Sequence, residues 1–219
     1  MKKCVLAAMI FLFGLVSVYS QEGGKFIVGL RGGIQIGMHE AADDYKAWMK
    51  LNKWSQENMP AGNLVVYGGY NFFKYFGFQT ELNFMLGQGI KGKYDDNHYV
   101  IMRYNSLDIP LLLRVNLFPD TFIKFGIIGG PYFTTPLGKV STELKNYTGS
   151  NEKNTIETPK WGMTFGVFGG PSLLDMGCII FGVRYITDFG ESKEKRKDFD
   201  FGFMKRQAIV INVGAEFYF

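Results

Sequence analysis

The sequence predicts an all-β protein, an eight-stranded antiparallel up-and-down transmembrane β-barrel, from three observations. Eight segments alternate apolar residues with small or polar ones, which is the period of a β-strand. The connections between them alternate long, short, long, short, long, short, long, a pattern typical of barrels in bacterial outer membranes. The face opposite the apolar one is crowded with glycine, whereas long charged and polar residues normally cover a surface that faces water.

The first three strands are predicted at Lys25–Gly37, Asn63–Phe72 and Phe76–Ile90. In each strand the large apolar residues share one parity, while Gly, Gln, Asn and a few charged residues occupy the other. Residues 38–62 form a long polar connection, whereas Phe73-Lys74-Tyr75 has the length of a hairpin turn. The second and third strands are therefore predicted to be a tight antiparallel pair.

The next two strands are predicted at Val100–Leu117 and Phe122–Thr135. The fourth strand places aliphatic residues at six alternating positions from Leu107 to Leu117, and Pro119-Asp120 makes a tight turn into the fifth strand. Aromatic residues gather at these short turns, where they predict one of the aromatic girdles of a membrane barrel. Those aromatic residues are Phe72, Phe73, Tyr75, Phe76, Phe118 and Phe122.

The sixth and seventh strands are predicted at Trp161–Pro171 and Gly177–Thr187, joined by a short connection over 172–176. Both alternate large apolar residues with glycine. Residues 136–160 and 188–206 are long connections rich in polar and charged residues. They belong with the other long connections at one end of the barrel, opposite the short turns and both termini.

The eighth strand, Gln207–Phe219, is the clearest in the chain. Counting back by twos from Phe219 meets only apolar residues as far as Ile209, and the length suits a tilted membrane strand of about ten residues. A terminal aromatic strand is typical of outer-membrane barrels, so Phe217 and Phe219 are predicted to form the insertion signal. An ordinary C-terminal strand of a soluble sheet is the alternative.

The first 20 residues resemble a secretory signal peptide. Lys2 and Lys3 precede an uncharged apolar run, Cys4–Val18, and a small-residue cleavage site ends at Ser20. The prediction is therefore a cleaved signal over 1–20 and one outer-membrane barrel domain over 21–219. Cleavage removes two lysines and leaves 22 basic against 20 acidic residues, a net charge too small to indicate nucleic acid. Cys178 is then the only cysteine, so no intramolecular disulfide can form.

The apolar face could in principle point inward, as in a soluble lipocalin-like barrel. The glycine-rich face argues against this, because a narrow eight-stranded interior needs small residues to make room for a few large ones. The apolar face is therefore predicted to face lipid. With this parity, the side chains of seven charged residues point into the interior: Arg31, Glu81, Asp108, Arg114, Lys124, Arg184 and Glu216.

These charges are predicted to pair into one structural network, because unpaired charges are costly away from water. Arg114 is expected to contact Asp108 or Glu81, which lie on neighbouring strands. The network either fills the barrel or marks an ion pathway. Filling is favoured, because eight strands leave room for little more than their own side chains.

No catalytic, cofactor-binding or metal-binding residues are predicted. His39 and His98 are expected to be solvated residues near the rim, and Ser106, on the lipid-facing parity, pairs with neither. The segment Asp43–Trp54 predicts a short amphipathic helix with Tyr45, Trp48 and Met49 on one face. Capping of the barrel mouth is favoured for this helix over contact with the membrane surface or a partner.

Three stretches resemble an outer-membrane β-barrel domain family of Bacteroidetes, the PorT-like or porin family proteins. They are Phe78-Gln79-Thr80-Glu81-Leu82, Leu107-Asp108-Ile109-Pro110-Leu111-Leu112-Leu113-Arg114 and Gly129-Gly130-Pro131-Tyr132. The family typically has Gln-Pro-Glu-Leu, Leu-Glu-Ile-Pro-Leu-Leu-Leu-Lys and Gly-Pro-Tyr there, so Thr80 and Asp108 are departures. The resemblance implies an eight-stranded outer-membrane barrel but little about activity, although one branch of the family serves secretion.

The expected function is that of a non-enzymatic protein of the bacterial outer membrane with a structural, adhesive or assembly/secretion-accessory role. A small-solute channel is the alternative, followed by an enzyme that modifies lipid A and then a soluble lipocalin-like binder. The expected partners are outer-membrane lipid and lipopolysaccharide, which the basic run Lys193–Lys197 would suit. Two further partners are expected: the barrel-assembly machinery, which would bind the last strand, and an unknown protein at the extracellular loops. Nucleic acid is not an expected partner.

Overall fold

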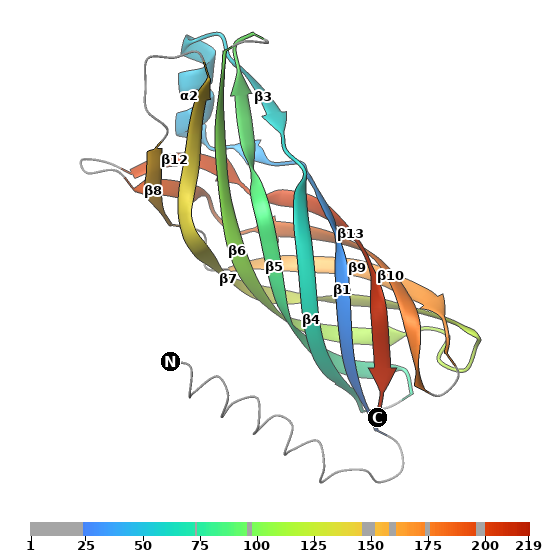
Figure 1. Ribbon diagram of the computed structural model, residues 1–219. Helices are drawn as coiled ribbons and strands as arrows, with labels where there is room; N and C mark the ends of the chain where they lie inside the picture. Colours follow the sequence, from blue (N-terminus) through green and yellow to red (C-terminus); the bar gives the residue numbers. More distant parts are fainter. Residues whose placement is uncertain are drawn as a thin grey trace.

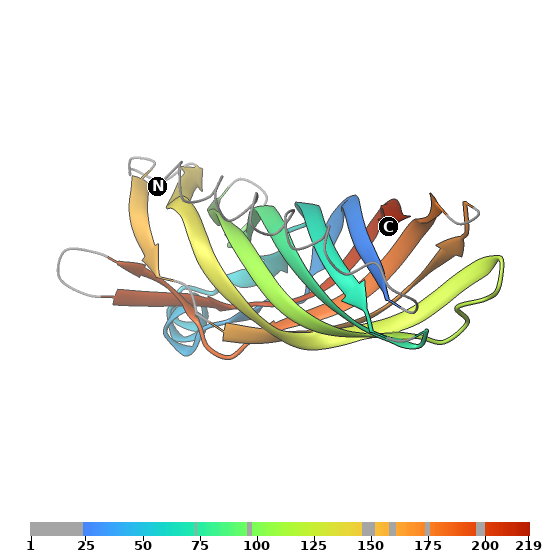
Figure 2. The same cartoon turned by 90° about the horizontal axis from the view of Figure 1, so that it is seen from below.

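The computed structural model describes residues 24–72, 74–95, 98–145, 152–157, 161–173, 176–195 and 200–219. Eight long antiparallel strands form a closed barrel in the order β7-β6-β5-β4-β1-β13-β10-β9, and β9 pairs back with β7 (Figures 1 and 2). Their bounds are β1 Lys25–Gly37, β4 Ala61–Asn71, β5 Phe76–Lys93, β6 Tyr99–Asn116, β7 Ile123–Lys145, β9 Trp161–Pro171, β10 Gly177–Asp188 and β13 Gln207–Tyr218. The predicted fold class is confirmed.

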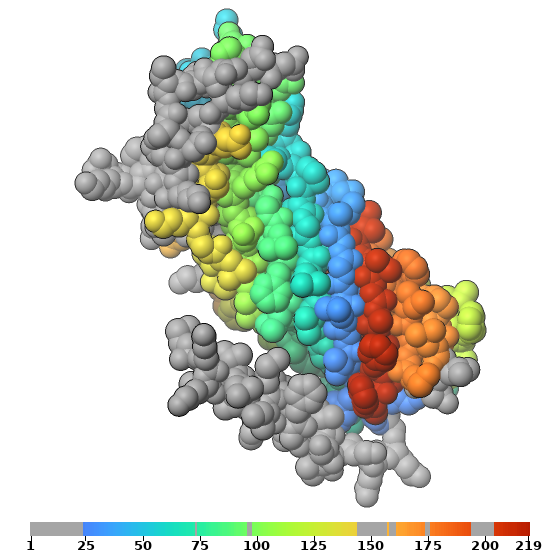
Figure 3. All heavy atoms as spheres, in the orientation of Figure 1, coloured from blue at the N-terminus to red at the C-terminus, as the bar shows by residue number. Residues whose placement is uncertain are grey.

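The alternation of each strand decides which side chains face outward. Figure 3 shows one side of the barrel, where β4, β1, β13 and β10 lie side by side. Large apolar residues are exposed along these strands, among them Leu30, Leu64, Phe181 and Val213. A belt of exposed apolar side chains is what a barrel spanning a lipid bilayer requires. Five of the six aromatic residues at the short turns are exposed, and Phe73 lies outside the described residues.

Three of the barrel strands are much longer than a membrane requires. A transmembrane strand needs about 9–11 residues, whereas β5 and β6 have 18 each and β7 has 23. The outward residues of β6 change from Leu107 to Asn105 and Arg103 toward the loop end, and those of β7 change from Leu137 to Lys139. The apolar belt therefore ends there, and the strands continue beyond it.

Five short strands, which the sequence did not predict, extend the barrel past this belt. They are β2 Glu40–Ala41, β3 Ser55–Asn58, β8 Glu152–Glu157, β11 Ser192–Lys195 and β12 Asp200–Lys205. They pair in the order β2-β12-β11-β8 with the loop end of β7, and β3 pairs with the loop end of β5. We call these strands, with the loop ends of β5, β6 and β7, the upper tier. Its strands keep the neighbours of the barrel below.

One side chain joins β2 to β3, between which no backbone pairing is described. The amide of Gln56 on β3 accepts a hydrogen bond from the Ala41 backbone (3.1 Å) and donates one to the His39 carbonyl (2.5 Å). The described residues contain four breaks near the end of the apolar belt, at 38–39, 59–60, 189–191 and Arg206, where strands of the upper tier meet strands of the barrel. The upper tier is therefore a second, less regular ring on the same eight-strand order.

The predicted helix is present as α2, Asp43–Leu51. Acidic Asp43 and Asp44 in its first turn and Lys50 in its last suit the helix dipole. Its buried face packs against inward residues of β5, β6, β7 and β12, including Ile90, Met102, Val140 and Met204. The helix thus fills the interior of the upper tier (Figure 1). None of the described helices is long and apolar enough to cross a membrane.

Candidate functional site: the polar interior of the barrel

The described part of the barrel interior holds four arginines and four carboxylates, each with at most 3% of its surface exposed. They are Arg31, Arg114, Arg184, Arg206, Glu81, Asp108, Asp188 and Glu216. All lie on the inward parity of their strands or directly beside them. They pair in three layers, stacked between the short turns and α2.

The lower layer joins β6 to β13 near the short turns. Arg114 donates two hydrogen bonds to Glu216, at 2.5 and 2.7 Å, and a third to Asn116 (3.0 Å). Tyr67 donates to the same carboxylate at 3.0 Å, and the Arg114 guanidinium lies 4.2 Å from the centre of the Phe168 ring. A bidentate arginine with further donors to its carboxylate is the arrangement in which a buried ion pair is well satisfied.

The middle layer places one carboxylate between two arginines. Arg184 donates to both oxygens of Glu81, at 2.5 and 2.7 Å, and Arg31 donates to one of them. Gln79 donates a further hydrogen bond at 2.5 Å. The Arg31 guanidinium also lies over the Tyr67 ring, 4.3 Å from its centre. This layer carries one more positive than negative charge.

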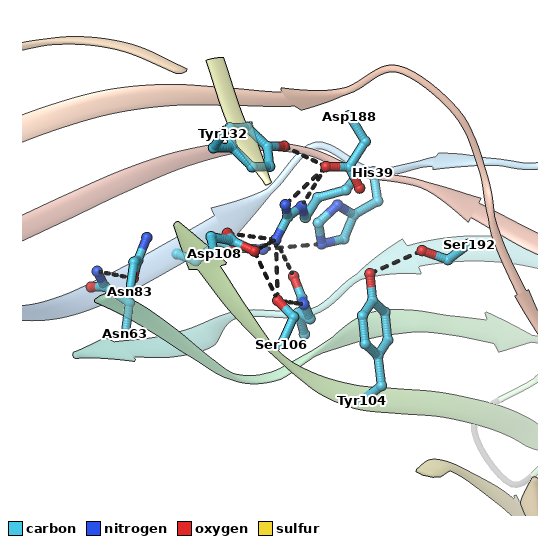
Figure 4. A network of polar contacts seen from close by, with 12 residues as sticks. His39, Asn63, Asn83, Tyr104, Ser106, Asp108, Tyr132, Asp188 and Ser192 are labelled. Carbon is cyan, nitrogen blue, oxygen red and sulfur yellow. Dashed lines mark hydrogen bonds and ion pairs between the residues drawn. The ribbon is translucent and has the colours of Figure 1, made fainter. Parts of the chain in front are cut away.

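The upper layer places one arginine between two carboxylates. Arg206 donates to Asp108 at 2.9 Å and to Asp188 at 2.8 Å, and Tyr132 donates to Asp188 (Figure 4). Gln88 also accepts from Arg206, at 3.2 Å. This layer carries one more negative than positive charge, so the eight charges of the three layers sum to zero.

Arg206 and Asp188 were missed because they were taken as the ends of a charged loop. Both continue the inward parity by one step: Asp188 follows Arg184 and Ile186, and Arg206 precedes Ala208 and Val210. Extending each predicted strand by one residue finds both. The many charged residues of the stretch between them hide this signal, because they resemble a loop.

Arg114 does not pair as predicted. It contacts Glu216, not Asp108 or Glu81, because shared parity brings side chains to the same interior but not to the same depth. Arg114 and Glu216 each lie two residues from the turn end of their strands, whereas Glu81 is five residues from the start of β5. Lys124 stays out of the layers. It is half-buried near the short turns, where its ammonium donates to the Pro119 carbonyl.

Two further expectations were wrong. Ser106 has the inward parity of Asp108, is buried, and hydrogen-bonds Asp108 (3.2 Å) and Gln88 (2.7 Å). His39 is buried beneath the upper tier, with its Nε2 3.4 Å from the Gln35 amide nitrogen. Burial, together with the charge of Arg206, lowers the pKa of His39 to about 4. His98 is half-buried beside Asp95.

Apolar and aromatic side chains fill the interior around the charged layers. Met85, Tyr132, Ile186 and Val210 form one buried cluster, and the α2 cluster lies above with Tyr104, whose hydroxyl is 3.0 Å from that of Ser192. Glycine makes the room: a Cβ built at Gly162 would lie 2.2 Å from the Tyr132 ring. Charged layers and apolar clusters thus follow one another through the described interior from the short turns to the helix.

The described residues include no group of three or more His, Cys, Asp or Glu that could hold a metal ion. Among those residues, the Ser106 hydroxyl hydrogen-bonds the Asp108 carboxylate and the Gln88 amide, and no hydrogen bond joins it to a histidine. The chemistry that the interior displays is therefore charge pairing and hydrogen bonding.

Comparisons with known proteins agree with this fold. The family model described as "Outer membrane protein beta-barrel domain" matches residues 19–202, well over half of the chain. No curated protein is similar enough to count as a match. The solved structure of outer membrane protein OprG from Pseudomonas aeruginosa is 14% identical, covers 90% of this chain and 96% of its own, and has a TM-score of 0.59. At that identity the likeness shows the fold alone.

Two other solved structures are less similar. Neisserial surface protein A (NspA) is 10% identical over 90% of this chain and 100% of its own, with a TM-score of 0.47. Ail of Yersinia pestis is 10% identical over the same shares, with a TM-score of 0.44. From the family model and the closed eight-stranded architecture, the chain belongs to the outer membrane protein beta-barrel domain family and is a barrel of the bacterial outer membrane.

Proposed function

We propose that this protein is a non-enzymatic, non-conducting scaffold that holds its upper tier at the cell surface for a structural, adhesive or secretion-accessory role. One observation supports this most directly: three layers of paired charges, each side chain at most 3% exposed, fill the described interior. An eight-stranded barrel is just wide enough for its own side chains, so a filled interior leaves no water column.

The height of the barrel supports a role at the surface. Strand β7 continues well beyond the apolar belt, and α2 fills the space between the strands above it. Much of the chain is thus devoted to a structure outside the lipid. The resemblance to PorT-like barrels of Bacteroidetes supports the secretion-accessory form of this role, with a protein partner at the upper tier.

Outer-leaflet lipid and lipopolysaccharide are the proposed partners at the membrane boundary. Arg103 on β6 and Lys139 on β7 are exposed just beyond the last outward apolar residues. Cations at that height suit the phosphates of the lipid headgroups. The basic run Lys193–Lys197 lies partly outside the described residues. The proposed signal peptide over 1–20 lies wholly outside them.

Conductance tests the proposal. Purified protein in a planar lipid bilayer is expected to show no large steady current. Deleting 43–54 removes α2 but leaves the three charged layers, so it is expected to open no pore. Truncating Arg114 and Glu216 together with Arg184 and Glu81 to alanine removes the lower ion pair, leaves only Arg31 in the middle layer, and is expected to raise conductance.

Only material that keeps its compact, heat-sensitive mobility on a gel is compared, so that unfolded variants are excluded. Large steady currents from the unmodified protein would overturn the scaffold proposal and favour a small-solute channel. A pore opened by the helix deletion alone would show that α2, and not the charged layers, closes the barrel.

A further inference from the structure

A row of unpartnered polar atoms crosses the inner wall at the middle layer. They belong to four side chains on four neighbouring strands: Arg31 on β1, Asn212 on β13, Arg184 on β10 and Thr164 on β9. In the described part of the chain, Nε of both arginines, Oγ1 of Thr164 and both amide atoms of Asn212 lack a hydrogen-bond partner. All four side chains are at least 96% buried. Buried polar groups almost always have partners, so such a row requires an explanation.

Contacts with the glycine-lined wall show that Arg31 and Asn212 are neighbours. The Arg31 Cγ lies 2.7 Å from a Cβ built at Gly214, two residues from Asn212 on the same face. Asn212 is itself in register with Gly33 on β1, two residues from Arg31. The two side chains therefore lie against one patch of wall.

The row continues across β10 to β9. The Asn212 Oδ1 lies 2.5 Å from a Cβ built at Gly182, the inward residue two before Arg184. The Arg184 Cγ lies 2.6 Å from a Cβ built at Gly166, the inward residue two after Thr164. Each side chain thus leans over a glycine beside the next member, which makes the row continuous.

The chemistry of the row favours an anion over water. The two guanidinium N–H groups, the Asn212 amide and the Thr164 hydroxyl are donors, against a single acceptor with no donating capacity, the Asn212 carbonyl. The net charge of the middle layer also favours an anion, because two arginines, Arg31 and Arg184, share one carboxylate, Glu81. The surplus carboxylate of the upper layer, Asp188, lies four residues beyond Arg184, roughly 13 Å along the strand, which is too far for contact.

We infer that Arg31, Asn212, Arg184 and Thr164 form an internal binding site for a monovalent anion of the chloride class. The anion accepts the unused hydrogen bonds and neutralises the extra positive charge of the middle layer. The site adds a structural ligand to the barrel, which goes beyond the proposed scaffold role.

Bromide tests the site in the unmodified protein. Crystals grown with bromide in place of chloride are expected to show an anomalous peak beside the Asn212 amide. The temperature at which the compact gel band is lost is expected to be higher in chloride than in gluconate, a bulky anion, at equal ionic strength. No anomalous peak, or equal temperatures in the two salts, would mean that the row binds water only and would overturn the inference.

Two variants remove the need for the anion by different chemistry. Arg31→Met deletes the surplus cation while Glu81 keeps its bidentate pair with Arg184, and Asn212→Asp supplies a carboxylate within the row. Both are expected to abolish the difference between chloride and gluconate. Lys124→Gln, which removes a cation outside the three layers, is the matched control and is expected to keep it. Loss of the difference in the control alone would place the anion effect elsewhere.

Discussion

At the scale of single residues, depth in the barrel decides which charges pair. Alternation sends Arg114, Glu81, Asp108 and Glu216 to the same interior, but each pairs only with groups at its own distance from the short turns. The partners come from distant parts of the chain: Arg114 and Glu216 are 102 residues apart. Each buried charge thus depends on a partner that its own strand does not supply.

Replacing Arg114 by leucine is expected to destabilise the folded barrel by about 3–5 kcal/mol, because Glu216 is left as an unpaired buried charge. The urea midpoint of the protein refolded in lipid vesicles measures this. The double variant Arg114→Leu with Glu216→Leu is expected to recover most of the loss. Arg103→Leu, an exposed arginine on the same strand, is the control. A similar loss in the control, or no recovery in the double variant, would contradict a role for the pair.

At the scale of elements, the ends of the strands differ from their middles. The middle of each strand alternates apolar and small residues, and apart from the loop end of β7 the predicted bounds differ from the observed ones by at most three residues. Beyond the apolar belt, β7 continues for ten residues past the predicted end at Thr135. The outward residues there, such as Lys139 and Ser141, are polar because they face water. Polar sequence therefore looked like loop although its backbone is paired.

The last strand offers a test of the predicted insertion signal. The Phe219 backbone exchanges two hydrogen bonds of 3.0 Å with Phe26, and its side chain is exposed. Deleting Phe219, or changing it to Asp, is expected to lower the amount in the outer membrane and leave protein in the periplasm, because the assembly machinery then lacks its aromatic end. Fractionation with immunoblotting measures this. Lys193→Ala, an exposed change at the other end, is expected to assemble normally, and equal levels of the two variants would refute the signal.

At the scale of the whole molecule, the barrel is a membrane-spanning half and an upper tier on one strand order. The lower half exposes apolar residues and buries charges, as lipid requires. The upper tier exposes polar residues and buries an apolar cluster around α2, as water requires. The distribution of apolar and polar side chains between the interior and the outer surface therefore reverses at the membrane boundary.

Cysteine labelling tests this arrangement and its orientation. Ser141→Cys, exposed on the upper tier, is expected to react with an impermeant maleimide on intact cells. Thr121→Cys, exposed at a short turn, is expected to react only after the outer membrane is permeabilised, because short turns face the periplasm. Leu111→Cys, within the apolar belt, is expected to stay unlabelled. The native Cys178 is buried and gives little background. Labelling of Thr121→Cys on intact cells would reverse the orientation.

The sequence by itself determined the barrel, the positions of its eight strands and the inward direction of six of the eight layered charges. These depend on alternation with a period of two, which is local and can be read one strand at a time. It also indicated α2, through the spacing of Tyr45, Trp48 and Met49.

Only the tertiary structure decided how these parts meet. The stagger of strands around the closed barrel decides which side chains and strands meet. It brings Arg206 to Asp108, 98 residues away, pairs the short strands of the upper tier, and aligns the row from Arg31 to Thr164. Stagger is set by closure and by contacts between distant strands. No single strand contains it, and for that reason the side chains inside the barrel were predictable while their partners were not.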